Sequence, residues 1–263
     1  MKIISGRRKR PRRTLFYGQH GVGKTTWAAG APEPIFLQCE EGLEDVGATR
    51  TELLTSVADV EEALTYLYNS QHNFKTVVVD TIDWLEKLIW KTICVREGVP
   101  SIDKIGFGKG PGYCLPTWDR FLSGLDSLRN VRGMSVVLLA HAKVTRFQDP
   151  KSDGYDRYEP DLHKTVCSML QEWSDEVFFG GQDVAVVSKE EGFGRERTRA
   201  VDIDRRIVYT CEMPTHLAKR RIEMPDKVDM VWSEYQKHID ASYAKIGDIE
   251  GIVRDGSSKQ DLV

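Results

Sequence analysis

Residues 18–25 read Gly18-Gln19-His20-Gly21-Val22-Gly23-Lys24-Thr25, and Thr26 follows. The three glycines allow the backbone to fold back so that several N–H groups point at one anion. An apolar segment precedes the stretch and a helical pattern follows it, so the helix N-terminus adds partial positive charge. The complete pattern predicts a phosphate-binding loop (P-loop, or Walker A motif) that holds a nucleoside triphosphate. The expected nucleotide-binding residues are Gly18, Gln19, His20, Gly21, Val22, Gly23, Lys24, Thr25 and Thr26.

Two side chains of this loop have specific expected tasks. The ammonium group of Lys24 should reach the β- and γ-phosphates, and the hydroxyl of Thr25 should bind Mg²⁺. Asp80 ends the apolar run Thr76-Val77-Val78-Val79 and should lie beside the loop. A carboxylate there can hold Mg²⁺ through a water molecule. Asp83 is a weaker candidate for this metal site, because an acid in the first turn of a helix can be there only for its favourable interaction with the helix dipole.

Length and composition are those of an ordinary globular protein. The chain has 263 residues, of which 40% are hydrophobic and 29% charged. One α/β domain with a substantial core is expected at this length. The formal net charge of −3 creates no overall field that would draw the protein to nucleic acid, so such contacts must come from local patches.

Cysteine usage and hydropathy predict a cytoplasmic protein. The five cysteines form no CxxC pair, which disfavours a metal knuckle and a disulfide framework and favours a reducing compartment. No apolar run approaches the roughly 20 residues that span a bilayer, so no membrane contact is expected. Residues 1–13 are basic but carry no apolar segment, so they do not form a secretory signal.

Short apolar runs alternate with amphipathic segments along the chain. The runs 76–80 and 135–140 are continuous, which is typical of parallel strands buried on both faces. Other strands are expected at 14–17, 35–37, 177–179, 184–188 and 206–210, with a hairpin turn at 192–194. The expected helices are 24–31, 56–70, 82–93, 117–129 and 226–246, with a further helix that ends near Trp173. The pattern predicts an α/β fold: a mostly parallel sheet flanked by helices, with an antiparallel C-terminal extension.

Four segments are expected from these patterns. They are a basic N-terminal arm at 1–13, a core at 14–224, an amphipathic helix at 225–250 and a disordered tail at 251–263. The arm is consistent with phosphate contacts, with a nuclear localisation signal or with a solvated tail. Its sequence does not decide among the three.

The order of parts resembles the core of RecA-like ATPases, which implies ATP and Mg²⁺ as cofactors. The segment 36–44 resembles the one that carries their catalytic glutamate, and alignment of Leu37 and Leu43 gives this role to Glu40. Glu41 remains an alternative, because both acids follow a strand that ends at the ligand edge of the sheet. His141 ends the run 138–140, where the family carries a glutamine or histidine that senses the γ-phosphate.

A more specific resemblance is to phage-encoded RecA-like ATPases of the single-strand annealing, Sak type. The segments 107–113, 155–164 and 172–175 carry it, and it extends from about Arg13 to Met224. The resemblance implies that the protein binds single-stranded DNA and promotes annealing or strand exchange in phage recombination. A phage single-strand binding protein is a further expected partner.

The polar connection 143–164 is the main candidate for contact with DNA. Cations can neutralise phosphates there, and aromatic rings can stack on unpaired bases. Acids in the same stretch dilute the charge, so a solvated loop, or one ordered by subunit contact, is an alternative. The expected DNA-binding residues, including one from the loop 107–113, are Lys109, Lys143, Arg146, Phe147, Lys151, Tyr155, Arg157, Tyr158 and Lys164.

Lys219 and Arg221 form a Lys-x-Arg pair after the last expected strand. In RecA-like, RadA-like and hexameric-helicase cores, such a pair reaches into the ATP site of the neighbouring subunit. The resemblance therefore implies a homo-oligomer, either a ring or a filament, in which these cations stabilise the transferred phosphoryl group. An exposed basic turn is the alternative.

Three other functions use the same loop. A hexameric helicase-like or packaging motor needs no different nucleotide site, although no separate primase, nuclease or zinc module is evident. A small-molecule kinase needs an acceptor pocket and a lid, for which only 143–164 is a candidate. A nucleotide-gated scaffold binds ATP without hydrolysing it.

Overall fold

A mostly parallel sheet forms the centre of the computed structural model, which describes residues 8–149, 153–191 and 195–255. The strand order is β2-β3-β4-β1-β6-β7-β8, and β5 pairs with β4 outside this path. The strands are β1 (Arg13–Gly18), β2 (Pro34–Gln38), β3 (Thr76–Asp80), β4 (Ser135–Phe147), β5 (Tyr155–Pro160), β6 (Glu176–Glu191), β7 (Arg195–Tyr209) and β8 (Lys227–Asp229). The first five in the order are parallel, whereas β7 and β8 are antiparallel, so the predicted fold class is confirmed.

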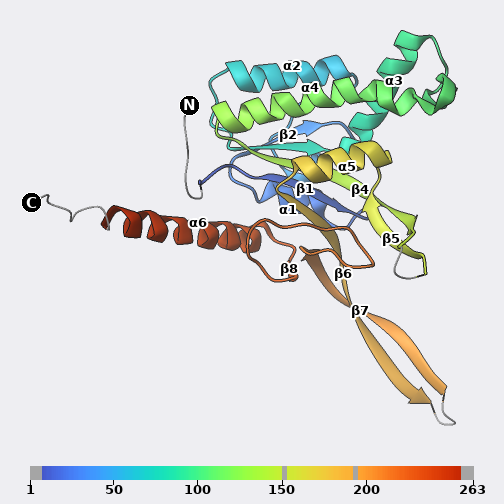
Figure 1. Ribbon diagram of the computed structural model, residues 1–263, viewed down its shortest axis with the longest axis vertical. Coiled ribbons are helices and arrows are strands. Elements are labelled where there is room, and N and C mark those ends of the chain that lie inside the picture. Colours follow the sequence, from blue (N-terminus) through green and yellow to red (C-terminus); the bar gives the residue numbers. More distant parts are fainter. Residues whose placement is uncertain (1–7, 150–152, 192–194, 256–263) are drawn as a thin grey trace, which may run out of the picture.

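Helices cover both faces of the sheet (Figure 1). One face packs against α2 (Val57–Asn69), α3 (Ile82–Glu97), α4 (Gly110–Val131) and α5 (Lys164–Trp173). The opposite face packs against α1 (Lys24–Ala29) and α6 (Trp232–Asp255). Short 3₁₀ helices occur at η1 (Glu44–Val46), η2 (Ile102–Lys104) and η3 (Gly106–Gly108).

The alternation of side chains along β1 explains why two separate cores form. Leu15 and Tyr17 point into the cluster under α2–α5, whereas Phe16 points into the cluster under α1 and α6. All three side chains are fully buried. Burial of each contributes about 1.5–3 kcal/mol, so β1 is held firmly between the two layers.

The first turn of α2 confirms a local prediction. The Ser56 hydroxyl accepts a hydrogen bond from the backbone N–H of Asp59, and the Asp59 carboxylate accepts one from the backbone N–H of Ser56. This reciprocal pair satisfies two N–H groups that a helix start leaves without partners.

The predicted polar loop 143–164 is instead mostly a β-hairpin. β4 continues to Phe147, β5 returns antiparallel to it, and Lys164 already begins α5. The rings of Phe147 and Tyr155 lie 5.5 Å apart across the pair, and the Arg157 guanidinium lies over Phe147 at 3.9 Å. Cross-strand ring contacts of this kind stabilise a hairpin whose sequence is otherwise polar.

Helix α4 begins earlier than predicted, at Gly110 rather than near Thr117. The glycine serves close packing, because a Cβ atom there would lie 2.3 Å from the carbonyl oxygen of Ile102. Gly110 therefore brings α4 against η2. Pro111 adds to the helix start, where its missing N–H costs nothing.

The second half of the chain differs from prediction in three ways. Residues 227–229 form β8, and the following helix begins at Trp232 and extends to Asp255, so it reaches into the segment expected to be disordered. The two strands expected at 177–179 and 184–188 are one long strand, β6. Beyond the sheet, β6 and β7 continue as a two-stranded arm (Figure 1); its predicted turn, 192–194, lies outside the described residues.

Residues 8–13 of the predicted basic arm lie against the body of the protein. Lys9 lies over the ring of Tyr243, and the Tyr243 hydroxyl donates to the carbonyl oxygen of Arg10. Arg12 forms an ion pair with Glu176. These contacts involve both side chains and backbone, so this part of the arm is integral to the fold.

Within the described ranges, no helix combines the length and the apolar character needed to cross a bilayer.

Candidate nucleotide-binding site

The P-loop lies at the carboxyl edge of the parallel strands, between β1 and α1. Gly18, the last residue of β1, pairs in register with His141 of β4 and with Gly180 of β6, and both neighbouring strands continue beyond this point. The backbone of Gly23 has φ 105°, a conformation that favours glycine. The parallel topology thus places the loop where α/β proteins bind ligands.

Lys24 is folded into the loop. Its side chain is buried, and Nζ donates hydrogen bonds to the carbonyl oxygens of Gly18 and Gln19, each at 3.1 Å. Burial lowers the pKa of Lys24, and the negative charge of nearby Asp80 partly opposes this. The ammonium group therefore lies at the centre of the loop, where a phosphate would need its charge neutralised.

Thr25 and Asp80 meet beneath the loop. The Thr25 hydroxyl donates to Asp80 Oδ2 across 2.9 Å, and the peptide bond after Asp80 is cis. Burial raises the pKa of Asp80 to about 6; the charge of Glu40 adds to the rise, while the Thr25 hydrogen bond and the charge of Lys24 oppose it. A hydroxyl and a carboxylate are both oxygen donors of the kind that Mg²⁺ prefers, so this pair fits the predicted metal site.

Glu40 faces the same space from the end of β2. Its Oε2 accepts a hydrogen bond from the Thr81 hydroxyl at 3.1 Å, and its backbone N–H donates to the carbonyl oxygen of Asp80 at 3.2 Å. Glu41 also lines the cavity but is exposed. The geometry favours Glu40 over Glu41 as the residue that orients a water molecule, because its carboxylate is held in place.

His141 is fixed by a partner that the sequence did not identify. Its Nδ1 lies 3.0 Å from Asp83 Oδ2, and its backbone N–H donates to Asp83 Oδ1 at 3.0 Å. Burial raises the pKa of Asp83, but the hydrogen bonds with His141 outweigh it, so the net pKa lies below its usual value. Asp83 thus remains a carboxylate that orients the imidazole ring.

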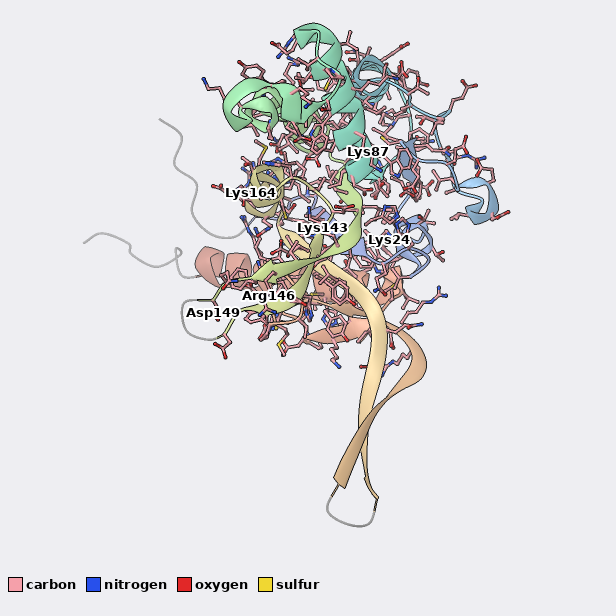
Figure 2. All side chains as sticks on the ribbon, turned by 90° about the vertical axis from the view of Figure 1, so that its right-hand side faces the viewer. Lys24, Lys87, Lys143, Arg146, Asp149 and Lys164 are labelled. Atoms are coloured by element: carbon pink, nitrogen blue, oxygen red, sulfur yellow. The ribbon has the colours of Figure 1, made fainter. Side chains whose placement is uncertain are left out.

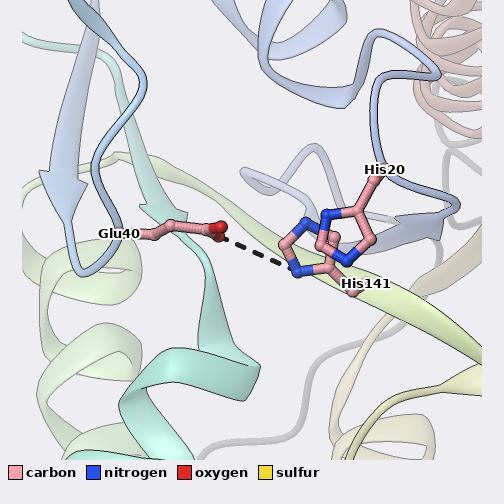
Figure 3. Close-up of side chains that lie close together, drawn as sticks. All are labelled: His20, Glu40 and His141. Atoms are coloured by element: carbon pink, nitrogen blue, oxygen red, sulfur yellow. Dashed lines mark ion pairs between the residues drawn. The ribbon is translucent and has the colours of Figure 1, made fainter.

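The imidazole of His141 also contacts the loop itself. The ring of His20 stacks on it with centroids 3.7 Å apart, and Glu40 Oε2 lies 3.8 Å from His141 Nδ1 (Figure 3). One ligand atom from each of these three residues lies within 4.8 Å of the other two. Imidazole and carboxylate groups at such spacing can hold a transition metal, although the rings are stacked rather than converging on one point.

These residues surround a cavity of about 340 Å³. Its walls include the P-loop, the hydrogen-bonded Thr25 and Asp80, the side chains of Glu40 and His141, and one cation from β7 that the sequence did not single out. The lining residues central to the site are Gly23, Lys24, Thr25, Thr26, Glu40, Asp80, Thr81, His141 and Arg206. Arg206 lies at the start of an expected strand, and nothing in its local spacing links it to the loop.

Most of the expected DNA-binding residues are on the β4–β5 hairpin. Figure 2 shows Lys143 and Arg146 on β4, Asp149 beyond its end, and Lys164 at the start of α5. Lys109 precedes the first turn of α4, and Lys151 lies outside the described residues.

The hairpin cations have acidic neighbours. Lys143 Nζ lies 3.5 Å from Asp161, Arg146 lies 3.3 Å from Asp156, and Arg157 lies 2.6 Å from Glu159. These pairs reduce the net positive charge that the hairpin offers. DNA binding by the hairpin therefore remains a prediction.

One hydrogen bond connects the hairpin to the P-loop. Gln19 Nε2 donates to the Tyr158 hydroxyl at 3.3 Å, and the Tyr158 ring stacks on Phe179 of β6 with centroids 5.0 Å apart. A side chain of the loop is thus in direct contact with β5.

The Lys-x-Arg pair lies away from this chain's own cavity. The Lys219 backbone pairs with Val177, and its Nζ donates to the carbonyl oxygen of Gln171. Arg221 lies 3.4 Å from Asp175, just before β6 and therefore toward the amino edge of the parallel strands. The expected role of the pair in a neighbouring subunit remains a prediction.

Comparison with known proteins adds two findings. A family model described as "AAA domain" matches residues 10–222, a range that contains the whole cavity lining. The SPbeta prophage-derived uncharacterized protein YorG of Bacillus subtilis (strain 168) is 24% identical over 220 residues, which cover 80% of this chain and 59% of that protein. The chain thus spans about three fifths of the length of this relative.

Proposed function

Because the chain belongs to the AAA domain family of P-loop ATPases, we propose that it hydrolyses ATP with Mg²⁺ and acts on single-stranded DNA in phage recombination or annealing. The hydrolytic part rests on one observation above all, the hydrogen bond between Thr25 and Asp80 beside the buried ammonium of Lys24. The prophage origin of the similar protein supports the phage setting.

The side chains divide the work of hydrolysis among them. The loop N–H groups and Lys24 bind the β- and γ-phosphates. Thr25 and Asp80 would hold Mg²⁺, which would neutralise charge on the phosphate oxygens. Glu40 orients a water molecule and accepts its proton as the water oxygen bonds to the γ-phosphorus. The bond between the γ-phosphorus and the bridging oxygen breaks, and ADP leaves with that oxygen.

His141 is suited to detect the γ-phosphate. It lies between Glu40 and the stacked ring of His20, and Asp83 fixes its orientation. A change at His141 would pass along β4 into the β4–β5 hairpin, which Gln19 also contacts through Tyr158. Both connections support the proposal that nucleotide state controls the hairpin, the expected site of DNA contact.

Assembly is the remaining part of the proposal. A ring or filament would place Lys219 and Arg221 at the ATP site of a neighbouring subunit, where cations stabilise the transferred phosphoryl group. A phage single-strand binding protein would present the DNA. The surface position of Arg221 is compatible with such an interface, since half of its side chain is exposed (53%).

The test is steady-state ATP hydrolysis without DNA, with single-stranded DNA and with double-stranded DNA. Stimulation by single strands is expected in the wild type and in a matched variant such as Asp119→Asn, which changes an exposed acid of α4. Lys24→Ala should abolish hydrolysis under every condition. If neither kind of DNA changes the rate of hydrolysis, the DNA-coupled part of the proposal is contradicted and the ATPase part stands. Unwinding of a forked duplex would favour the motor function instead.

A further inference from the structure

Arg206 brings a cation to the P-loop from a distant part of the chain. It lies on β7 and lines the same cavity as Lys24 and Thr25. A Cβ atom built on Gly23 would lie 3.0 Å from Arg206 Nη1 and 3.8 Å from its Cδ. The guanidinium therefore lies directly against the backbone of the phosphate-binding loop.

The fold explains how β7 delivers this side chain. β7 is antiparallel to the neighbouring β6, and Arg206 pairs with Gln182 of β6. Gln182 lies two residues beyond Gly180, which pairs with Gly18 at the end of β1. Arg206 shares its sheet face with Val208, which packs in the α1-side core. A register shift follows immediately, between Gln182 and Val184.

Arg206 differs from the cations around it in its charge environment. Arg205 lies 2.7 Å from Asp229, Lys227 lies 2.9 Å from Asp183, and Arg220 lies 2.8 Å from Asp226. Among the described residues, no carboxylate lies within the 4.0 Å ion-pair distance of Arg206. The side chain is exposed and free to meet an anion from the cavity.

The cavity needs a second cation. The carboxylates of Glu40, Glu41 and Asp80 line it. Apart from Arg206, Lys24 is the only Lys or Arg side chain among the described lining residues. The phosphate chain of a nucleotide carries several negative charges, and the planar guanidinium fork matches phosphate oxygens better than an ammonium does.

We propose that Arg206 binds, within its own chain, phosphate oxygens that ATP and ADP share. This inference rests on the proposed function, since it assumes that the P-loop holds a nucleotide. The position beside Gly23, rather than beside Glu40 or His141, favours the part of the phosphate chain that both nucleotides contain. Arg206 is thus a binding group, distinct from Lys219 and Arg221, which are expected to act on a neighbouring subunit.

The experiment is a fluorescence titration of the full chain with N-methylanthraniloyl ADP and the matching ATP analogue, together with kcat and KM for ATP. The variants are Arg206→Gln, Arg206→Lys and the control Arg205→Gln, which changes the adjacent exposed cation on the same strand. Charged hydrogen bonds of this kind predict a loss of about tenfold or more in affinity for both nucleotides in Arg206→Gln. Arg206→Lys should recover part of it, and Arg205→Gln should bind like the wild type.

The outcomes separate the inference from the function beneath it. A parallel loss for ADP and ATP, seen as a higher KM with kcat little changed, supports the shared-phosphate contact. A loss confined to ATP, or equal binding by Arg206→Gln and Arg205→Gln, overturns it while the ATPase stands. A wild-type protein that binds neither nucleotide overturns both.

Discussion

The hydroxyl of Thr25 donates to the carboxylate of Asp80 across 2.9 Å. Thr25 lies in the first turn of α1 and Asp80 is the last residue of β3, so the bond ties the phosphate-binding loop to a buried strand two positions away from β1 in the sheet. The same two oxygen donors would hold the metal, so structural support and metal binding meet in one contact.

Replacement of Asp80 by Asn should reduce kcat for ATP at least about 100-fold, because an amide neither carries the charge nor orders Mg²⁺ as a carboxylate does. Nucleotide affinity measured without Mg²⁺ should change far less, since Lys24 and the loop remain. Asp119→Asn, on the exposed face of α4, is the control. Unchanged kcat in Asp80→Asn would remove Asp80 from the metal site.

The raised pKa of Asp80 predicts a pH-dependent activity. Only the carboxylate form binds Mg²⁺, so kcat/KM should fall as pH drops through about 6. Because the metal competes with the proton, a higher Mg²⁺ concentration should move the midpoint to lower pH. The measurement is a series of pH profiles from 5 to 8 at several Mg²⁺ concentrations. A midpoint that Mg²⁺ does not move would point to another titrating group.

The raised pKa of Glu86 predicts that the free energy of unfolding falls as pH rises, whereas the activity is expected to rise with pH. It is buried in α3 and accepts hydrogen bonds from the backbone N–H of His163 at 3.0 and 3.2 Å. Burial raises its pKa to about 7, while the His163 hydrogen bond opposes the rise. The folded state therefore binds a proton that the unfolded state releases near pH 4.5, so stability is highest below that pH and is lost as pH rises toward 7.

The variant Glu86→Gln should lack this part of the pH dependence. At about 1.36 kcal/mol per pKa unit, the wild type should lose on the order of 3 kcal/mol more than the variant between pH 4.5 and pH 8. Urea unfolding at both pH values measures the difference. Parallel pH profiles for the two proteins would show that Glu86 titrates normally.

Arg12 is expected to be essential for stability rather than for binding. It forms an ion pair with Glu176, whose side chain is fully buried and also accepts a hydrogen bond from Tyr235 at 3.2 Å. Arg12→Ala would leave that carboxylate buried without its cation, at a cost of about 3–5 kcal/mol. Arg8→Ala, at an exposed position of the same basic segment, should cost almost nothing. Chemical unfolding of both variants measures the contrast.

Local patterns predicted the centre of the fold well. The P-loop, the strand that ends at Asp80 and the capped start of α2 each depend on residues a few positions apart, and all three elements are present. The prediction of a mostly parallel sheet followed from buried β-branched runs and is confirmed.

Long-range pairings were beyond such patterns. Asp83 was predicted only as a weaker metal-site candidate or a helix-dipole residue, because its partner His141 comes from a distant strand. Arg206 reaches the loop only through the antiparallel return of β7. The hairpin of β4 and β5 was interpreted as a loop because ring contacts between Phe147 and Tyr155, rather than alternation of apolar residues, hold it together.

The position of β1 in the sheet sets the order in which the protein can fold. Thr14 lies opposite Val137 on one side and Glu176 on the other, so one edge of β1 can pair only once β4 is available and the other only once β6 is available. Closing such long loops costs entropy before any pairing repays it, which slows folding. A growing chain that has not yet reached Glu176 keeps one edge of its first strand unpaired. The strand that leads into the phosphate-binding loop is then an exposed edge on which another chain can pair, and folding must outpace aggregation there.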